Sequence, residues 1–173
     1  MKNKVVLIGM PGCGKSTIGK LVSKELNLKF CDMDNYIENM TAKTIPQLFE
    51  HGEDYFRDFE TLACKELSEK SNILISSGGG VVKRKENIEI LKKESFIIFI
   101  DRPLEDLLND VDISKRPLLK EGKEKILKLY EERYELYRSS ADEIVKNDKG
   151  IRDAINKVKK LLKNNQLTMH NEG

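Results

Sequence analysis

Short apolar runs alternate along the chain with segments in which apolar residues recur every three or four positions. Runs of strand length without charged residues lie at 5–8, 73–75, 96–100 and 144–145, and a further extended segment is expected at 29–32. Helical spacing marks the segments 18–26, 45–51, 56–67, 88–91, 123–138 and 151–162. Because strands that alternate with helices form a parallel sheet covered on both faces, the pattern predicts an α/β fold. A ligand is then expected at the carboxyl ends of the strands.

The size of the chain indicates one domain. Its 173 residues suffice to bury a hydrophobic core without disulfides or metals. We expect the domain to span residues 1–164 and residues 165–173 to form a disordered tail, because the apolar periodicity ends there. The 31 basic residues nearly balance the 29 acidic ones, for a net charge of +2. This balance argues against a nucleic-acid partner, whose recognition needs a clustered basic excess.

The composition also limits location and metal chemistry. No stretch reaches the eighteen consecutive apolar residues of a membrane span, and the apolar run at 5–8 is too short for a signal peptide. We therefore expect a cytoplasmic protein with no membrane partner, and separately we expect a monomer. Three cysteines without a CxxC pair, and only two histidines, argue against a disulfide framework and against a His/Cys metal site.

The strongest chemical signal follows the first predicted strand. Residues 9–16 read GMPGCGKS, which fits G-x-x-x-x-G-K-[ST] between a strand and a helix. In such a loop, glycines let backbone N–H groups approach phosphates, Lys15 reaches the β- and γ-phosphates, and Ser16 offers a hydroxyl to Mg²⁺. The alternative is a turn that only tightens the strand–helix corner, but the complete motif favours nucleotide binding. Cys13 is either a thiol of lowered pKa or, as we favour, a small side chain that fills space.

Polar residues and glycines follow the second and third predicted strands. Asp32 and Asp34 are two residues apart, so in extended backbone they would lie on one side. One could hold metal-bound water while the other orients or accepts the proton of an acceptor hydroxyl. The alternative is that Asp34 caps the next helix. Gly78, Gly79 and Gly80 would let a ligand reach backbone N–H groups, or they form a flexible loop.

Two arginines could bind an anionic acceptor. Arg57 lies beside the apolar stripe of the helix at 56–67. The alternative is that its side chain points into solvent from the exposed face of this helix. Arg133 interrupts an apolar and aromatic stripe that includes Tyr130 and Tyr137. A guanidinium held against the core favours a carboxylate or phosphate partner. An internal ion pair or a snorkelling side chain is the alternative for Arg133.

Residues 109–122 show no periodicity and contain Pro117 and Gly122, so we expect a loop there. A mobile loop that carries Lys115 and Arg116 could close over the phosphates, exclude water and bring a positive charge to the transition state. An ordinary surface loop is the alternative.

Together these segments resemble the shikimate kinase family, small enzymes with a P-loop and a fold similar to nucleoside monophosphate kinases. The resemblance covers residues from about 4 to 162. It rests on the order and spacing of GMPGCGKST, DMD at 32–34, FR at 56–57, SGGG at 77–80, RPLL at 116–119 and RxxLY at 133–137. It implies a three-layer P-loop kinase fold with a central five-stranded parallel sheet, a substrate-binding segment at about 33–61 and a mobile lid at about 109–122.

The resemblance also implies an activity and its residues. Family members transfer the γ-phosphoryl group of ATP to the 3-hydroxyl of shikimate with Mg²⁺, in chorismate and aromatic amino acid biosynthesis. The catalytic residues it implies are Lys15, Asp34 and Arg116. The nucleotide-binding residues are Gly12, Cys13, Gly14, Lys15, Ser16, Thr17 and Arg116. Shikimate would contact Asp34, Arg57, Gly78, Gly79, Gly80 and Arg133, and Mg²⁺ would bind Ser16 directly and Asp32 through water.

The chain departs from the family pattern in two places. Glu135 stands where the family often has a proline. The lid begins with Asp110 and Asp112, where the family usually has basic residues, often including an arginine that packs on adenine. We expect these acids to oppose closure of the lid over phosphates unless they face solvent or pair with Lys115.

Two other functions fit parts of the sequence. A gluconate-type kinase of the same fold is one, although the SGGG and RPLL segments favour shikimate. A catalytically silent binding module is the other, but every catalytic residue that the family needs is present.

Adenine contacts are expected near Asn147 and Asp148.

Overall fold

The computed structural model describes residues 2–110, 116–165 and 167, and for residues 116–121 it describes the backbone alone. Its centre is a parallel five-stranded sheet in the order β2-β3-β1-β4-β5. The strands are β1 (Lys4–Ile8), β2 (Lys29–Asp32), β3 (Ile73–Ser76), β4 (Ser95–Asp101) and β5 (Glu143–Lys146). In the register, Lys4 pairs with Ile73 on one side and with Ser95 on the other. The predicted α/β fold with a parallel sheet is therefore confirmed.

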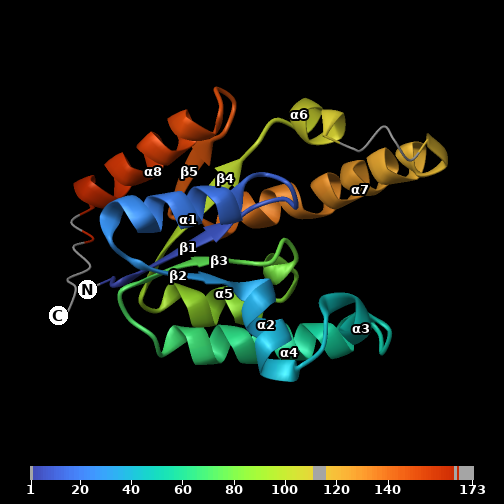
Figure 1. Cartoon of the computed structure of the whole chain (residues 1–173), viewed down its shortest axis with the longest axis horizontal. Helices are drawn as coiled ribbons and strands as arrows, with labels where there is room; N and C mark the ends of the chain where they lie inside the picture. The colour runs from blue at the N-terminus through green and yellow to red at the C-terminus, as the bar shows by residue number, and fades with distance from the viewer. Residues whose placement is uncertain (1, 111–115, 166, 168–173) are drawn as a thin grey trace.

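Helices cover both faces of this sheet (Figure 1). They are α1 (Lys15–Leu26), α2 (Met33–Thr41), α3 (Ile45–Phe49), α4 (Glu53–Ser68), the short turn η1 (Val81–Lys83), α5 (Lys85–Lys92), α6 (Leu104–Asn109), α7 (Arg116–Ser140) and α8 (Ile151–Asn164). α1 and α8 pack together on one face, and α4 and α5 pack together on the other. The core lies between these layers, where every residue of β1 and nearly every residue of β4 is buried. The chain thus forms the expected three layers.

The segment expected to be a loop at 109–122 is the main correction. Asn109 ends α6, and α7 already begins at Arg116, so the loop prediction is wrong for residues 116–122. Pro117 is compatible with a helix here because it lies in the first turn, where its missing N–H has no helical acceptor. Gly122 is tolerated inside a helix of this length. The stretch 111–115 lies outside the described residues.

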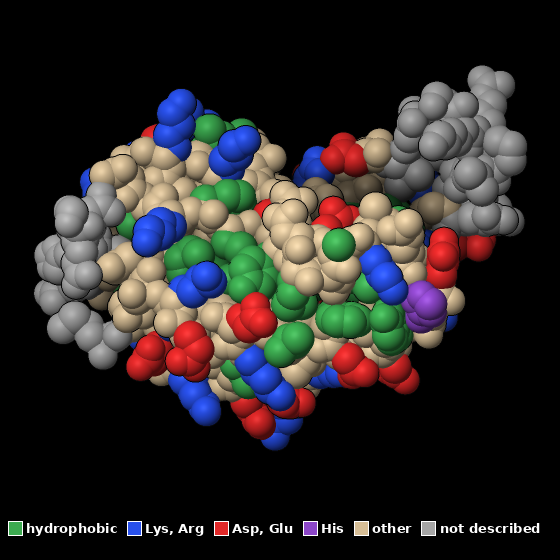
Figure 2. Space-filling view, turned by 60° about the horizontal axis from the view of Figure 1, so that its bottom comes forward, with side chains coloured by type: hydrophobic (Ala, Val, Ile, Leu, Met, Phe, Trp, Pro, Cys, Tyr) green, Lys and Arg blue, Asp and Glu red, His purple; other side chains and the backbone are tan. Residues whose placement is uncertain are grey.

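The described surface mixes charge and apolar groups. Figure 2 shows one face, on which acidic and basic side chains are interspersed around hydrophobic ones. Large apolar side chains that are more than a third exposed come from several separate elements: Phe49, Leu62, Leu127, Leu136, Ile144 and Ile151. Within the part of the chain that the structure describes, no helix has both the length and the apolar character needed to cross a membrane.

Candidate active site

The P-loop connects β1 to α1 at the carboxyl end of the sheet. Gly12 and Gly14 adopt left-handed backbone angles (φ of 80° and 99°), which only glycine reaches without strain. A Cβ added at Gly9 would lie 2.6 Å from the carbonyl oxygen of Ile100, so the loop also runs too close to β4 for any side chain. Lys15 is buried, and its Nζ donates to the carbonyl oxygens of Gly9 (2.7 Å) and Met10 (3.0 Å). The ammonium group is therefore held inside the loop.

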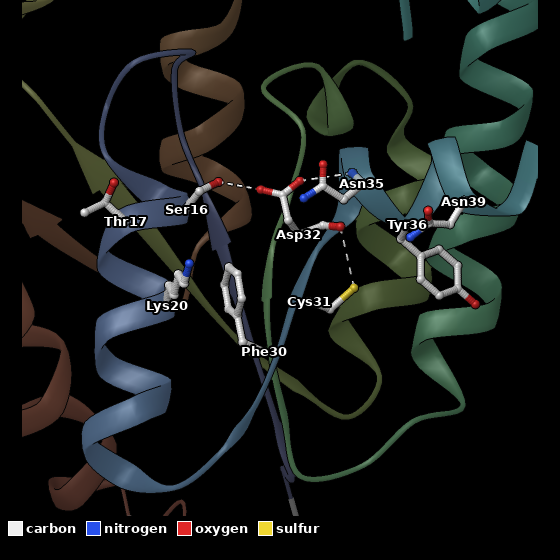
Figure 3. A pocket seen from close by; sticks show the side chains of 9 residues that line it. All are labelled: Ser16, Thr17, Lys20, Phe30, Cys31, Asp32, Asn35, Tyr36 and Asn39. Carbon is white, nitrogen blue, oxygen red and sulfur yellow. Dashed lines mark hydrogen bonds between the residues drawn. The ribbon is translucent and has the colours of Figure 1, made fainter. Parts of the chain in front are cut away.

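A hydroxyl and a carboxylate meet at the start of α1. The Ser16 hydroxyl donates to Asp32 Oδ2 (2.6 Å) and lies 3.0 Å from the Ser76 hydroxyl. Both Ser16 and Asp32 border an open pocket of about 580 Å³ between α1 and α2, which Thr17 also lines (Figure 3). Hydroxyl and carboxylate oxygens are the ligands that Mg²⁺ prefers, so this pair fits the ion.

The two aspartates of the DMD segment do not lie in one extended strand. β2 ends at Asp32, whose Oδ1 accepts from the backbone N–H of Asn35 (3.2 Å) and so caps α2. Asp34 lies in the first turn of α2. Both the extended geometry and the alternative in which Asp34 caps the helix are therefore wrong, because the cap forms two residues earlier.

Asp34 faces a cavity that it shares with the P-loop. This cavity has a volume of about 400 Å³, and Lys15, Ser16, Asp34 and Gly79 are among its lining residues. Burial raises the pKa of Asp34 above the usual Asp range, and the nearby Asp32 carboxylate adds to this, while Lys15 and Arg57 act against it. A carboxylate of raised basicity thus lines the same cavity as Lys15.

The three glycines after β3 lie in a packed turn. A Cβ at Gly78 would lie 3.1 Å from both Asp34 Oδ1 and Glu60 Oε2, and a Cβ at Gly79 would lie 2.8 Å from Cγ of Pro11. A Cβ at Gly80 would overlap the guanidinium of Arg57. Side chains therefore press on each glycine, and the flexible-loop alternative is wrong.

Arg57 is buried between two carboxylates of its own helix. Its Nη1 donates to Glu60 Oε1 (2.8 Å), and its Nε and Nη2 donate to Glu53 Oε1 (3.3 and 3.2 Å). Glu53 also pairs with Lys83. The side chain of Arg57 is only 7% exposed, so the alternative of a solvated helix face is wrong.

Glu60 is a residue of the site that the sequence reasoning missed. It is fully buried, and within the described part of the chain its Oε2 has no hydrogen-bond partner. Burial raises the pKa of Glu60, the Asp34 carboxylate adds to the rise, and the guanidiniums of Arg57 and Arg133 oppose it. Its position three residues after Arg57 was the available signal, because side chains at that spacing meet on a helix.

Arg133 on α7 completes the buried charge cluster. It is 7% exposed, and none of the ion pairs between described side chains involves it. Its charge acts on Glu60 and also on Tyr137, whose hydroxyl donates to the carbonyl oxygen of Gly79. Burial nonetheless dominates at Tyr137 and raises its pKa to about 12. The structure thus brings Asp34, Arg57, Arg133 and the glycine turn to one side of the P-loop.

A third cavity adjoins the P-loop at Gly12, Cys13 and Gly14. It has a volume of about 260 Å³ and is lined by Gly12, Cys13, Gly14, Arg102, Asp106, Asn147, Asp148, Gly150 and Ile151. The Asn147 side chain donates to the carbonyl oxygen of Cys13 (3.0 Å), which ties the loop after β5 to the P-loop. Cys13 is fully buried, which agrees with a space-filling role.

Part of the predicted lid cannot be placed. Asp112 and Lys115 lie outside the described residues, and Arg116 is described by its backbone alone, at the start of α7. Asp110 is described, and it pairs with Arg102 rather than with a lid lysine.

Phosphoryl transfer needs a phosphate cradle and an acceptor positioned beside it. In this molecule the P-loop and Asp34 line one cavity beside a parallel sheet, an arrangement typical of P-loop kinases. A family model described as shikimate kinase matches residues 11–163. The chain belongs to the shikimate kinase family.

Several individual proteins that are similar to this chain are shikimate kinases, and the similarity covers nearly the whole length of both chains. A shikimate kinase from Clostridium beijerinckii is 74% identical over 165 residues, which cover 95% of this chain and 98% of the relative. One from Clostridium botulinum strain Alaska E43 is 59% identical over 165 residues, covering 95% of this chain and 100% of the relative. Among solved structures, the shikimate kinase from Acinetobacter baumannii in complex with shikimate has a TM-score of 0.86 and 32% identity, with 97% of each chain covered. The shikimate kinase from Aquifex aeolicus has a TM-score of 0.82 and 40% identity, covering 95% of this chain and 98% of the other.

Proposed function

We propose that this chain transfers the γ-phosphoryl group of ATP to the 3-hydroxyl of shikimate, which yields shikimate 3-phosphate and ADP for aromatic amino acid biosynthesis. The observation that carries the proposal is the single cavity of about 400 Å³ that joins Lys15 and Ser16 to Asp34 and Gly79. Relatives named shikimate kinase, and a neighbour that holds shikimate, support this choice of acceptor.

Asp34 would take the proton of the attacking hydroxyl. The hydroxyl oxygen forms a bond to the γ-phosphorus, the bond from that phosphorus to its bridging oxygen breaks, and ADP leaves. The hydroxyl proton passes to Asp34, whose raised pKa makes it a better acceptor than an ordinary aspartate. Positioning and charge supply the rest of the catalysis.

The P-loop would hold the phosphates. Lys15 exchanges its contacts with Gly9 and Met10 for phosphate oxygens, and the N–H groups at the start of α1 point to the same place. Ser16 would bind Mg²⁺ directly and Asp32 through a water. The ion supplies positive charge against the phosphates when it is bound. The remaining nucleotide contacts would come from Gly12, Cys13, Gly14 and Thr17.

The buried arginines would recognise the carboxylate of shikimate. Arg57 and Arg133 supply two planar guanidiniums in a site with little water, where pairing with a carboxylate is strongest. An incoming carboxylate can replace the half-exposed Glu53 at Arg57, while Glu60 keeps its hydrogen bond to the other side of the guanidinium. The glycine turn would bind the ring hydroxyls through its backbone.

Three further expectations belong to the proposal. By the family resemblance, Arg116 at the start of α7 would reach the transferring phosphate. The domain would span residues 1–164. The protein would act as a cytoplasmic monomer.

A coupled assay of ADP release tests the function. With ATP and Mg²⁺, we expect shikimate to stimulate ADP release and gluconate to leave it at the background rate. Stimulation by gluconate alone would assign the chain to the gluconate-type kinases. No stimulation by either acid would contradict the proposal.

A further inference from the structure

One buried amide links the glycine turn at 78–80 to helix α4. Asn87 is fully buried near the start of α5, and its side-chain nitrogen donates to the carbonyl oxygen of Val81 (3.1 Å), directly after the turn. Its side-chain oxygen accepts from the hydroxyl of Thr61 on α4 (2.7 Å). Because a carbonyl can only accept, the amide nitrogen must face Val81 and the amide oxygen must face Thr61. Asn87 therefore joins two elements of the acceptor side by two buried hydrogen bonds.

The carbonyl oxygens of the glycine turn are occupied, whereas two of its N–H groups have no acceptor among the described residues. The carbonyls of Gly78 and Gly80 accept from backbone N–H groups of η1 (3.2 and 3.0 Å), and that of Gly79 accepts from the Tyr137 hydroxyl. The N–H groups without an acceptor are those of Gly79 and Gly80. A trans peptide unit is planar, with its N–H opposite its carbonyl, so fixing the carbonyls also fixes the direction of these donors.

The turn has no room to shift without moving its neighbours. A Cβ at Gly80 would lie 2.2 Å from Nη2 of Arg57, and a Cβ at Gly79 would lie 2.8 Å from Cγ of Pro11. The turn is thus packed between the P-loop and the Arg57 guanidinium. Its position along α4 decides how the N–H groups of the turn lie relative to that guanidinium.

The other polar links between this region and α4 are exposed ion pairs. Lys83 pairs with Glu53, which is 46% exposed, and Arg84 pairs with Asp58, which is 73% exposed. Exposed pairs of this kind contribute little and are screened by salt. The buried bonds of Asn87 are therefore the links that hold the turn at a fixed distance from α4.

We propose that Asn87 is a positioning residue for the acceptor, because its amide holds the glycine turn so that the N–H groups of the turn and the Arg57 guanidinium bind one shikimate molecule together. The proposal deepens the proposed function and rests on it for the identity of the acceptor. Donors that are fixed before the ligand arrives lose less entropy when it binds. Since neither hydrogen bond of Asn87 involves the P-loop, the residue should act on shikimate and not on the nucleotide.

Calorimetric titration with shikimate and, separately, with ADP tests this role. Asn87→Ala should weaken shikimate binding by about tenfold, the scale of one lost polar contact, and should leave ADP binding unchanged. Leu91→Ala is the matched control, since Leu91 is a fully buried side chain of the same helix and has no part in the hydrogen-bond network. The control should unfold at a lower temperature but bind shikimate as the wild type does. Unchanged shikimate affinity in Asn87→Ala, an equal loss of ADP binding, or an equal loss of shikimate binding in Leu91→Ala would overturn the proposal.

A pair of variants at Thr61 tests the same link without removing the amide. Thr61→Val removes the hydroxyl that donates to Asn87, whereas Thr61→Ser keeps it. In Thr61→Val, KM for shikimate should rise by about threefold while kcat at saturating shikimate changes little, and Thr61→Ser should restore the wild-type KM. The same KM in both variants, or a fall in kcat with no change in KM, would contradict the positioning role.

Amide NMR of the protein without ligands separates this inference from the proposed function. The N–H signals of Gly79 and Gly80 should shift and exchange faster with water in Thr61→Val than in Thr61→Ser or in the wild type. Identical signals in all three proteins would overturn the inference, even in a protein that phosphorylates shikimate. A wild type that binds no shikimate would refute the proposed function, and these signals would still decide whether the link holds the turn.

Discussion

The two sides of the P-loop hold their arginines in different ways. On the acceptor side, Arg57 and Arg133 are buried, and Arg57 is fixed by the fully buried Glu60. On the nucleotide side, Arg102 is partly exposed and is fixed by Asp110, which is mostly in solvent. The acceptor side is built from α4 and α7 packed on the core, whereas Arg102 and Asp110 flank the short helix α6.

This difference bears on specificity. A buried guanidinium without a partner has an uncompensated desolvation cost, which weakens the binding of any ligand that does not pair with it. The acceptor side should therefore reject ligands that lack a well-placed carboxylate. An exposed ion pair contributes little and is screened by salt, so the nucleotide side should tolerate change better. Substitutions on the two sides should therefore differ both in the size of their effect and in the ligand that they affect.

The largest effect is expected at Asp34. Asp34→Asn keeps the size of the side chain and removes its basicity, so turnover should fall by roughly 10²-fold or more, the scale of general-base loss. ADP binding should stay near the wild-type value, because the change lies on the acceptor side. Steady-state kinetics together with calorimetry measure both quantities, and near-normal turnover would remove Asp34 from the chemistry.

A smaller, selective effect is expected at Arg133. Arg133→Lys keeps the charge but cannot form the bidentate fork, so shikimate affinity should fall by about tenfold. Affinity for ADP should not change. If titration shows the same shikimate affinity in both proteins, Arg133 is a structural residue.

Two hydroxyls on α7 allow a matched comparison. Tyr137 donates to the carbonyl oxygen of Gly79 on the acceptor side, and Tyr134 donates to Asp101 Oδ2 (3.0 Å) at the end of β4. Tyr137→Phe leaves the half-buried Gly79 carbonyl without its donor and opens a gap at a fully buried side chain, so it should lower the free energy of unfolding by about 1–3 kcal/mol, while Tyr134→Phe should lower it by about 1 kcal/mol. Tyr137→Phe should also raise KM for shikimate, and Tyr134→Phe should not. Equal effects on stability and on KM would contradict the difference between the two sides.

The smallest effect is a pH dependence at Glu60. Because its pKa is raised in the folded chain, the folded chain binds more protons than the unfolded chain between the two pKa values. Wild-type stability should therefore fall as pH rises from the ordinary Glu pKa through the raised value, by about 1.4 kcal/mol per unit of the rise. Glu60→Gln lacks this titration.

Urea unfolding of the wild type and of Glu60→Gln over a pH series measures the difference in their free energies of unfolding. Glu135→Gln is the control, since Glu135 is 77% exposed. A difference that stays flat, or that moves in favour of the wild type as pH rises, would contradict the raised pKa.

The strands, the P-loop and the short helix at 45–51 could be predicted because each depends on local pattern. That helix is α3, and Thr44 and Gln47 form a capping box at its start. The start of α7 was missed because Pro117 and Gly122 resemble loop residues, although proline suits a first helical turn.

Residues whose environment depends on tertiary packing could not be read from the sequence. A glutamate on a helix is usually exposed, so the three-residue spacing from Arg57 indicates a contact with Arg57 but not the burial of Glu60. Arg102 lies in no phosphate-binding motif, and its contact with Gly12 joins residues 90 positions apart. The end of β2 at Asp32 was predicted, but the pattern did not show that α2 begins at the next residue, which makes Asp32 rather than Asp34 the helix cap.

Phosphorus NMR of the product tests the central claim most directly. After incubation of the protein with ATP, Mg²⁺ and shikimate, we expect one new phosphate monoester whose phosphorus couples to the proton on carbon 3 of the ring. Coupling to a proton at another ring position, or the absence of any new monoester, would contradict the account.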